Sequence, residues 1–307
     1  GRMANSLDIL TASHPALRGV APAVGRLDRA PYLRLVYKAP DLHPVLTRRD
    51  PAFIRRVYPA MTAVVDHYFR TEVEGAENLS DRSSLVVATH NGGIITPDIH
   101  CLLVAYWRRF GLETPGYGMM HQAAFHIPLL GPFLTKIGAV PASRANAEIV
   151  LDADMPLLVC PGGDEDALKP FRDRHRIRFG KRRGFIRLAI RKQAPIIPVV
   201  SVGAHETMFV LNDGRRTAEV TGFARFLRIK SVPLVASFPF GLTPAGIFSI
   251  PLPSKIRLRI LPKIELGEPP RAADSDAIVE RCFEHVRSAM QVALGDLARR
   301  RRRVILG

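Results

Sequence analysis

Cysteine is scarce in this chain: 307 residues contain only Cys101, Cys160 and Cys282, and these do not form a CxxC pair. Three separated cysteines argue against a disulfide framework and a cysteine zinc site, and they are typical of a reducing compartment. Aromatic residues are also few, at 7%. Because 47% of the residues are hydrophobic and 23% are charged, the chain nevertheless has the composition of a folded globular protein.

The sequence also lacks a long apolar run free of helix breakers. A membrane-spanning helix needs about 20 consecutive apolar residues. The nearest candidate, residues 231–254, has no charged residue but contains five prolines and two glycines. Since proline inside a helix removes a backbone hydrogen bond, we do not expect a spanning helix there. Two interpretations of this segment remain, an irregular wall of an apolar pocket or a surface loop that enters a bilayer, and both indicate a lipid ligand.

Negative charge is in short supply, because 28 acidic residues against 44 basic ones give a net charge of +16. Such a chain is expected to bind nucleic acid, anionic membranes or phosphorylated substrates. No nucleic-acid partner is expected, because Trp107 and the six tyrosines are not interleaved with the basic run and no nucleic-acid-binding module is recognisable. That run, residues 169–192, is either a solvated face or a phosphate-binding element.

Short apolar runs alternate with helical patterns from residue 71 onward. Strands are predicted at residues 84–89, 155–160, 194–200 and 255–260, and helices at 96–110, 184–192 and 274–303. This alternation predicts an α/β fold with a central, mostly parallel sheet flanked by helices. We divide the chain into an N-terminal arm with an amphipathic helix, residues 1–70, and an α/β domain, residues 71–307. The amphipathic helix, at 51–70, is expected either to pack on the core or to lie on a membrane surface.

A histidine follows the first predicted strand, at the sheet edge where α/β proteins collect their catalytic groups. Two of the three residues after His90 are glycines, which allow a tight turn with outward-facing N–H groups. Asp98, in the first turn of the next helix, is placed to accept a hydrogen bond from the imidazole and so to make His90 a base toward a hydroxyl. The run Thr96-Pro97-Asp98 is equally an ordinary helix start, in which Asp98 serves the helix dipole alone.

Four segments, in order, resemble the blocks of the glycerolipid acyltransferase superfamily, the lysophosphatidic acid acyltransferase-like proteins. They are His90–Asp98, Gly138–Arg144, Val159–Glu165 and Ala194–Val199, and the third has the Pro-Gly-Gly form associated with the diacylglycerol-acyltransferase-like branch. The resemblance covers about residues 70 to 205. Two positions depart from the family pattern. Ile95 stands where the commonest first block has its aspartate, and Asp164 or Glu165 replaces the glutamate of the third block.

The resemblance implies an acyltransferase that moves a fatty acyl group from acyl-coenzyme A or acyl carrier protein to a hydroxyl of a lysophospholipid, glycerolipid or glycolipid. His90 would be the base and Arg144 would bind the acceptor's phosphate, without an acyl-enzyme. The absence of a Gly-x-Ser-x-Gly elbow agrees with this and disfavours a serine hydrolase. Backbone N–H groups near Gly162 and Gly163, or near Gly92 and Gly93, are the candidates for holding the oxyanion. The candidate catalytic residues are His90 and Asp98, and the candidate substrate-binding residues are Asn91, Gly92, Gly93, Gly138, Arg144, Pro161, Gly162, Gly163, Glu165, Lys181, Arg182 and Arg183.

No metal ion and no cofactor besides the acyl donor are expected. His121 and His126 have four residues between them, which is not the i, i+4 spacing of a zinc helix, and Pro128 argues against a long helix there. The acyl chain is expected to lie against apolar residues of 119–140 and 231–254. The expected location is the cytoplasmic face of a membrane, where apolar loops and basic residues such as the five arginines 299–303 hold a peripheral or monotopic protein. The alternative, favoured by Ile95, is a non-catalytic lipid- or membrane-binding protein on the same fold.

Overall fold

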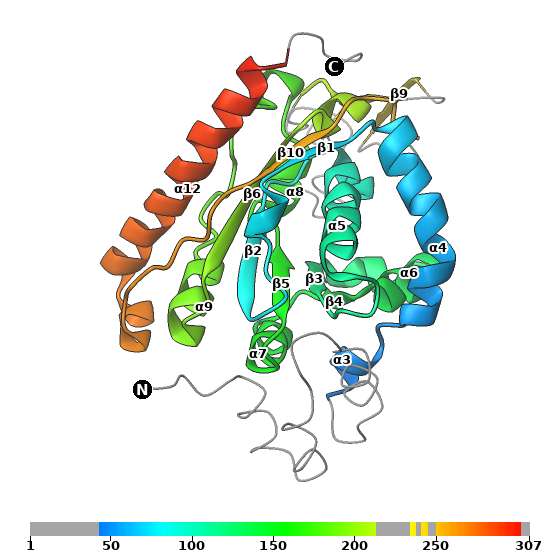
Figure 1. Ribbon diagram of the computed structural model, residues 1–307. Coiled ribbons are helices and arrows are strands. Elements are labelled where there is room, and N and C mark those ends of the chain that lie inside the picture. The colour runs from blue at the N-terminus through cyan, green and yellow to red at the C-terminus, as the bar shows by residue number, and fades with distance from the viewer. Residues whose placement is uncertain (1–42, 213–233, 238–240, 245–249, 302–307) are drawn as a thin grey trace, which may run out of the picture. The chain divides into compact units, whose positions relative to one another are not determined.

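The computed structural model describes residues 43–212, 234–237, 241–244 and 250–301 (Figure 1). It is an α/β structure, and its seven-stranded sheet has the order β1-β10-β6-β2-β5-β3-β4. The strands are β1 (Glu72–Glu74), β2 (Ser84–Ala88), β3 (Tyr117–Met120), β4 (Ala139–Pro141), β5 (Pro156–Val159), β6 (Ile196–Val202) and β10 (Arg257–Ile260). Strand β10 runs antiparallel to β6, whereas β1 pairs with β10, and β3 with β4 and β5, in parallel. The α/β class and the mostly parallel sheet expected from the sequence are confirmed.

The chain divides into two compact units. Within the described residues, the first unit comprises 43–57, 80–85 and 110–158, and the second comprises 58–79, 86–109 and the residues from 159 onward. A domain boundary at residue 70 stays a prediction, and most of the arm, residues 1–42, lies outside the described residues.

The first unit contains the helices α3 (Pro44–Thr47), α6 (Leu130–Ile137) and α7 (Arg144–Asp152) together with β3 and β4. Gly138 ends α6 with a φ of 104°, and a Cβ at this position would lie 2.7 Å from the carbonyl oxygen of Gly116. Only glycine fits such a turn without strain. Ser143 then caps α7 by accepting a hydrogen bond from the N–H of Asn146.

The second unit contains β1, β6 and β10 with the helices α5 (Pro97–Phe110), α8 (Gly163–Ala167), α9 (Gly184–Lys192) and α12 (Asp276–Arg299). Helices α9 and α12 lie on one side of β6 and β10, and α5 lies on the other (Figure 1). Every residue of β2 and β6 is buried, which explains why both read as continuous apolar runs. Strand β10 alternates half-buried and buried residues, as the sequence predicted.

The amphipathic segment 51–70 forms α4 (Pro51–Ala63), which continues directly into a π-helix, η3 (Val64–Tyr68). It packs on the protein core, where Val65 is buried and Tyr58 meets Trp107 edge to face at a centroid distance of 6.2 Å. Val64 and Tyr68 remain exposed. One face of the segment therefore packs on the core, while the end of the helix presents apolar side chains to solvent, and a place on a membrane surface stays a prediction.

The uncharged segment 231–254 is described in part. It contributes β8 (Leu234–Ser237) and β9 (Gly241–Pro244), which form an antiparallel sheet with β7 (Phe209–Val210). Met208, Val210 and Val235 build a small core of their own, against which Leu168 packs. Among the described residues, helices with the length and apolarity needed to cross a bilayer are absent.

The C-terminal arginines differ from one another in their surroundings. Arg299 and Arg300 are exposed and pair with Asp296, whereas the side chain of Arg301 is only 4% exposed, donates to Glu206 Oε1 at 2.5 Å and donates to Ser254 Oγ at 3.0 Å. Arg302 and Arg303 lie outside the described residues. The expectation that all five arginines face a membrane is therefore wrong for Arg301, because its guanidinium neutralises a buried carboxylate.

Candidate functional site

The candidate site is built on the turn that follows β2. Gly92 and Gly93 both have positive φ, at 80° and 69°. A Cβ at Gly92 would lie 2.7 Å from the carbonyl oxygen of Ala204 and 2.7 Å from the Pro97 ring, so this position requires glycine. Thr96 also has a left-handed conformation, with a φ of 49° just before α5. A non-glycine residue in that region costs of order 1–3 kcal/mol, which indicates a turn held firmly by its surroundings.

His90 projects from this turn half-buried. Its backbone N–H donates to Asp166 Oδ2 at 2.8 Å, and its ring Nδ1 is buried without a hydrogen-bond partner in the described part of the chain. Burial lowers the pKa of His90 to about 4, with the Lys169 ammonium lowering it further and Asp166 and Asp164 opposing. The ring is therefore neutral at pH 7 and has a nitrogen that can take a proton.

Asp98 does not pair with the imidazole. Its Oδ2 accepts hydrogen bonds from the Asn91 N–H at 3.1 Å, from Asn91 Nδ2 at 3.3 Å and from Ser201 Oγ at 2.7 Å, and its Oδ1 accepts the Ile99 N–H at 3.0 Å. Across the described residues, hydrogen bonds between Asp98 and the His90 ring are absent. The sequence-based pairing of His90 with Asp98 is therefore not found, because the Asp98 carboxylate is hydrogen-bonded to Asn91 and Ser201 instead.

This polar cluster consists of Thr89, Asn91, Asp98 and Ser201, all of them buried. Asn91 Nδ2 also donates to Ser201 Oγ at 2.8 Å, and the Ser201 N–H donates to Thr89 Oγ1 at 3.1 Å. Burial raises the pKa of Asp98 to about 7, although the hydrogen bonds from Ser201 and Asn91 oppose the shift. Asn91, predicted to bind substrate, is thus one of the residues that fix the turn.

The Pro-Gly-Gly turn follows β5 and leads into α8. A Cβ at Gly162 would lie 2.2 Å from Asp166 Cβ and 2.7 Å from the carbonyl oxygen of Arg178. At Gly163, with a φ of 51°, a Cβ would lie 2.1 Å from Arg182 Nη1. Gly162 is therefore needed for close packing of the turn, whereas Gly163 is favoured by its left-handed backbone.

We expect Gly162→Ala to lower the free energy of unfolding by about 1–3 kcal/mol, because the added methyl group overpacks the contact with Asp166. Gly184→Ala is the matched control, since a Cβ there meets nothing within 4 Å at the start of α9. It should stay within about 0.5 kcal/mol of the native chain. Urea unfolding of both variants measures the difference, and equal stability would contradict the packing described for Gly162.

The acid that faces the candidate base is Asp166, which sequence reasoning missed. Asp164 and Glu165, the two acids considered, are exposed, and Asp164 pairs with Arg182 at 2.7 Å. Asp166 is fully buried and ion-pairs with the equally buried Lys169 at 2.8 Å. The i, i+3 spacing of Asp166 and Lys169 is the signal in the sequence that could have identified this pair.

The basic run does not present its cations as one free cluster. Arg182 donates to the carbonyl oxygens of Pro161 and Gly162 at 3.2 and 2.7 Å, and so clamps the Pro-Gly-Gly turn. Arg183 forms a two-point ion pair with Glu280. Lys181 is exposed. The predicted convergence of Lys181, Arg182 and Arg183 on one anion is thus not formed here, because carboxylates and carbonyls of the protein occupy the two arginines.

Gly138 and Arg144 belong to the first unit. Arg144 is exposed at the start of α7, where its Nε donates to Glu148 Oε1 at 2.8 Å. Also in this unit, His121 Nδ1 accepts the Ala123 N–H and caps a short 3-10 helix, η6 (Gln122–His126). Among the described residues, no three His, Cys, Asp or Glu side chains are grouped so that they could hold a metal ion.

The chain is similar to proteins that transfer acyl groups. The family model named diacylglycerol acyltransferase matches residues 46–244, a range that contains every candidate residue named above. An uncharacterised protein of Mycobacterium tuberculosis (strain ATCC 25618 / H37Rv) is 31% identical over 268 residues, which are 84% of this chain and 70% of that protein. Human 2-acylglycerol O-acyltransferase 3 is 27% identical over 147 residues, 46% of this chain and 43% of the human protein.

A solved structure, the 1-acyl-sn-glycerophosphate (LPA) acyltransferase of Thermotoga maritima, aligns with a TM-score of 0.45 and 17% sequence identity. The alignment covers 88% of this chain and 96% of the Thermotoga chain.

Proposed function

The chain belongs to the diacylglycerol acyltransferase family and is an acyltransferase, and from that premise we propose that it moves a fatty acyl group from an acyl thioester to a hydroxyl of a lipid. The donor is acyl-coenzyme A or acyl carrier protein, and the acceptor is a lysophospholipid, glycerolipid or glycolipid. Relatives named 2-acylglycerol and diacylglycerol O-acyltransferase support a glycerolipid acceptor in particular.

The placement of the His90 imidazole on a firmly held turn, with its Nδ1 unpartnered among the described residues, is the single observation that carries this proposal. The ring lies on a turn fixed by Asp166 and by the Asn91–Asp98–Ser201 cluster, and its Nδ1 has no hydrogen-bond partner within the described residues. A neutral imidazole has one nitrogen that can accept a proton, and a residue whose backbone is held in place keeps that nitrogen in position, as a general base requires. The pKa of about 4 keeps nearly all of the ring in the base form at pH 7.

In the proposed reaction, His90 takes the proton of the acceptor hydroxyl while the oxygen attacks the thioester carbonyl carbon. The carbon–oxygen bond forms, and the carbonyl electrons move to the oxygen as a tetrahedral oxyanion. Collapse of this intermediate breaks the carbon–sulfur bond, and the thiolate takes the proton from the imidazolium. An ester and a free thiol are the products, and His90 returns to its neutral form.

The turn after His90 is the better candidate for holding the oxyanion. The N–H of Gly163 already donates to the carbonyl oxygen of Cys160 at 3.1 Å, so it is engaged within the Pro-Gly-Gly turn. Gly92 and Gly93 adjoin the base, and their positive φ angles turn the backbone sharply there. Backbone N–H groups aimed at a developing charge are typical of acyl transfer. We further propose that Arg144 binds an anionic group of the acceptor, for which it would exchange its exposed pairing with Glu148.

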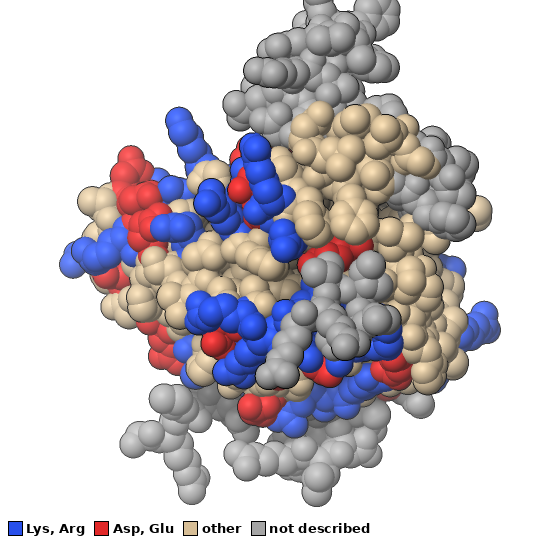
Figure 2. Space-filling model, turned by 90° about the horizontal axis from the view of Figure 1, so that it is seen from above, with Lys and Arg blue, Asp and Glu red and all other residues tan. Residues whose placement is uncertain are grey.

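We also propose that the protein works at a membrane surface as a peripheral or monotopic protein, on the cytoplasmic face. Exposed apolar side chains in the second unit support this: Val64, Tyr68, Leu211, Leu242 and Ile250. Tyr68 donates to the carbonyl oxygen of Pro251 at 2.6 Å, which links η3 to the segment that carries Ile250. Many Lys and Arg side chains on the face shown in Figure 2 agree with attraction to anionic lipid.

Leu242→Glu is expected to weaken binding to vesicles of mixed anionic and zwitterionic phospholipid about tenfold or more, because the apolar burial of one leucine contributes about 1.5–3 kcal/mol. Leu242 is 63% exposed on β9, and Val292, 72% exposed on α12, provides the control. Co-sedimentation should leave Val292→Glu bound as the native chain is. Equal loss in both variants would contradict a docking role for the second sheet.

Acyl transfer is tested by thiol release from long-chain acyl-coenzyme A, measured with lysophospholipid, diacylglycerol and glycolipid acceptors in turn, and repeated with acyl carrier protein as donor. The proposal predicts release that depends on one class of acceptor. If the protein binds the lipids but releases no thiol from either donor, the non-catalytic lipid-binding alternative replaces the proposal.

A further inference from the structure

A fully buried ion pair lies directly beside the candidate base. The side chains of Asp166 and Lys169 are both 0% exposed, and Lys169 Nζ donates to Asp166 Oδ1 at 2.8 Å. Taking two charges out of water costs several kcal/mol for each ion, and the attraction between them offsets that cost only when the geometry is good. Stability alone therefore does not explain why these two residues are charged.

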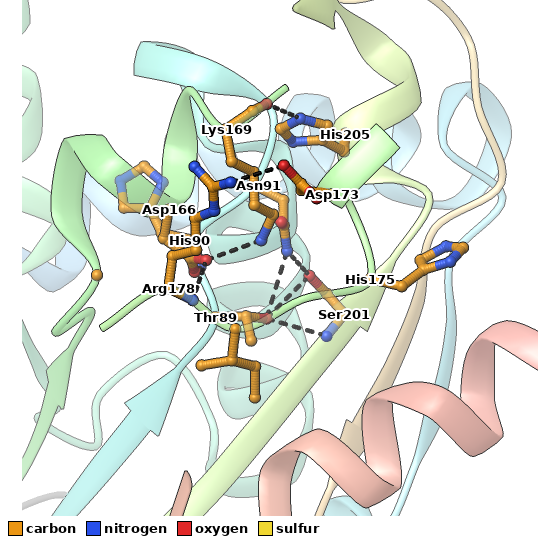
Figure 3. A network of polar contacts seen from close by, with 12 residues as sticks. Thr89, His90, Asn91, Asp166, Lys169, Asp173, His175, Arg178, Ser201 and His205 are labelled. Atoms are coloured by element: carbon orange, nitrogen blue, oxygen red, sulfur yellow. Dashed lines mark hydrogen bonds and ion pairs between the residues drawn. The ribbon is translucent and has the colours of Figure 1, made fainter. Parts of the chain in front are cut away.

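The carboxylate of Asp166 joins three segments of the chain (Figure 3). Oδ2 accepts the backbone N–H of His90 at 2.8 Å, while Oδ1 accepts the Lys169 ammonium and the backbone N–H of Arg178 at 3.1 Å. The His90 ring forms no hydrogen bond within the described residues. The histidine is thus held through its backbone, and the ring stays free to accept a proton.

The backbone of Lys169 is anchored as well. The backbone carbonyl of Lys169 accepts a hydrogen bond from His205 Nε2 at 2.6 Å, which ties this turn to η8 (Ala204–Thr207). The same short helix places the carbonyl oxygen of Ala204 against Gly92. One buried pair therefore connects α8, η8 and the turn after β2.

We propose that Asp166 and Lys169 are positioning residues for the acyltransferase base: the carboxylate fixes the backbone of His90, and the ammonium balances the negative charge of that carboxylate beside the ring. The inference rests on the proposed role of His90 and adds a pair that sets the position of that residue and the charge around its ring.

The charged groups around His90 come from a few elements. Asp164 and Asp166 face it from α8, and Lys169 faces it from the turn that follows. Behind these, Arg182 pairs with Asp164, Arg178 pairs with Asp173 at 2.6 Å, and His205 contacts the Lys169 carbonyl. The negative charge of Asp166 also raises the pKa of Asp98, which lies on α5. Asp166 raises the pKa of His90 more strongly than Lys169 lowers it. Removing Lys169 alone should therefore raise the pKa of the ring, and removing both charges should lower it.

Lys169→Met is expected to raise the pKa of His90 by about one unit or more, because the cation is lost and the buried carboxylate remains. The pKa is measured by NMR titration of the labelled ring, and the acid limb of kcat/KM should move upward with it. Asp173→Asn is the matched control, since it removes another buried carboxylate of the same loop that does not contact His90. It should leave the ring pKa in place.

The double variant Asp166→Asn/Lys169→Met keeps the test decisive if Lys169→Met does not fold. This variant lacks both charges, while the side-chain amide oxygen at position 166 can still accept the hydrogen bond from the His90 backbone N–H. Its ring pKa should fall below that of the native chain, because the stronger of the two effects is removed. An unchanged ring pKa in these variants would overturn the inference. Shifts of the expected sign in a chain whose acyl transfer survives His90→Ala would uphold the electrostatic effect of the pair on the ring but refute His90 as the base.

Discussion

Replacing His90 by alanine is expected to lower kcat/KM for acyl transfer by ~10²–10⁴, the usual contribution of a general base. The fold should survive, because the backbone N–H that donates to Asp166 is kept and the ring makes no hydrogen bond within the described residues. Thiol release and urea unfolding, measured on the same preparation, separate loss of activity from loss of stability.

His175→Ala is the matched control for that experiment. His175 is also a partly buried histidine whose pKa is lowered to about 4 by burial and by the charges of Arg174, Arg301 and Lys169. It lies outside the turn after β2, so its loss should leave kcat/KM within about threefold of the native value. Two variants with equal activity would contradict the assignment of His90.

The second large effect concerns Asp98 and pH. Asp98 has a pKa of about 7 in the folded chain against about 3.8 in the unfolded one, so the folded state holds the proton more tightly. Stability linked to this proton is fully present below about pH 4 and is lost as the pH rises to 7, at about 1.4 kcal/mol per pH unit and about 4 kcal/mol in total. His90, His175 and His205 have lowered pKa values and act in the opposite direction.

Asp98→Asn isolates this effect, because the histidine contributions cancel in the comparison with the native chain. The free energy of unfolding of the variant, minus that of the native chain, should rise from pH 4 to pH 7 and become level above pH 8. Asp164→Asn, at an exposed carboxylate whose pKa Arg182 lowers, should show no such rise. If the difference in the free energy of unfolding between Asp98→Asn and the native chain does not change with pH, the pKa of Asp98 is not raised in the folded chain. The Asp98→Asn variant should lose less acyltransferase activity than His90→Ala, since Asp98 does not form a hydrogen bond with the imidazole.

Most of the longer strands of the main sheet and the helices that flank it could be predicted from the hydrophobic pattern of the sequence. Residues 184–192 were predicted as a helix and form α9 with those bounds, and the alternating run at 255–260 contains β10. The short strands β1, β3 and β4 were missed, because three or four residues carry too little periodicity. The second sheet was missed because prolines obscured its strands.

Within the site, the place of His90 at the end of a buried strand was predictable from the sequence, and its role as a base stays a prediction. The partner of Asp98 was not, because Ser201 is 103 positions away and only the strand β6 brings it to Asp98. Asp166 and Lys169 were hidden for another reason. Their i, i+3 spacing is compatible with an ion pair, but charged residues in a polar, basic stretch are usually solvated, and the sequence does not show that α8 and the turn after it bury these two.

Counting the ester formed for each thiol released tests the central claim most directly. The native chain is incubated with long-chain acyl-coenzyme A and the glycerolipid acceptor, the new ester is measured by mass spectrometry, and the thiol is measured in the same sample. Direct transfer predicts one ester per thiol, and no thiol release when the acceptor is left out. Thiol release at an undiminished rate without acceptor, with free fatty acid as the product, would contradict the account and identify a thioester hydrolase.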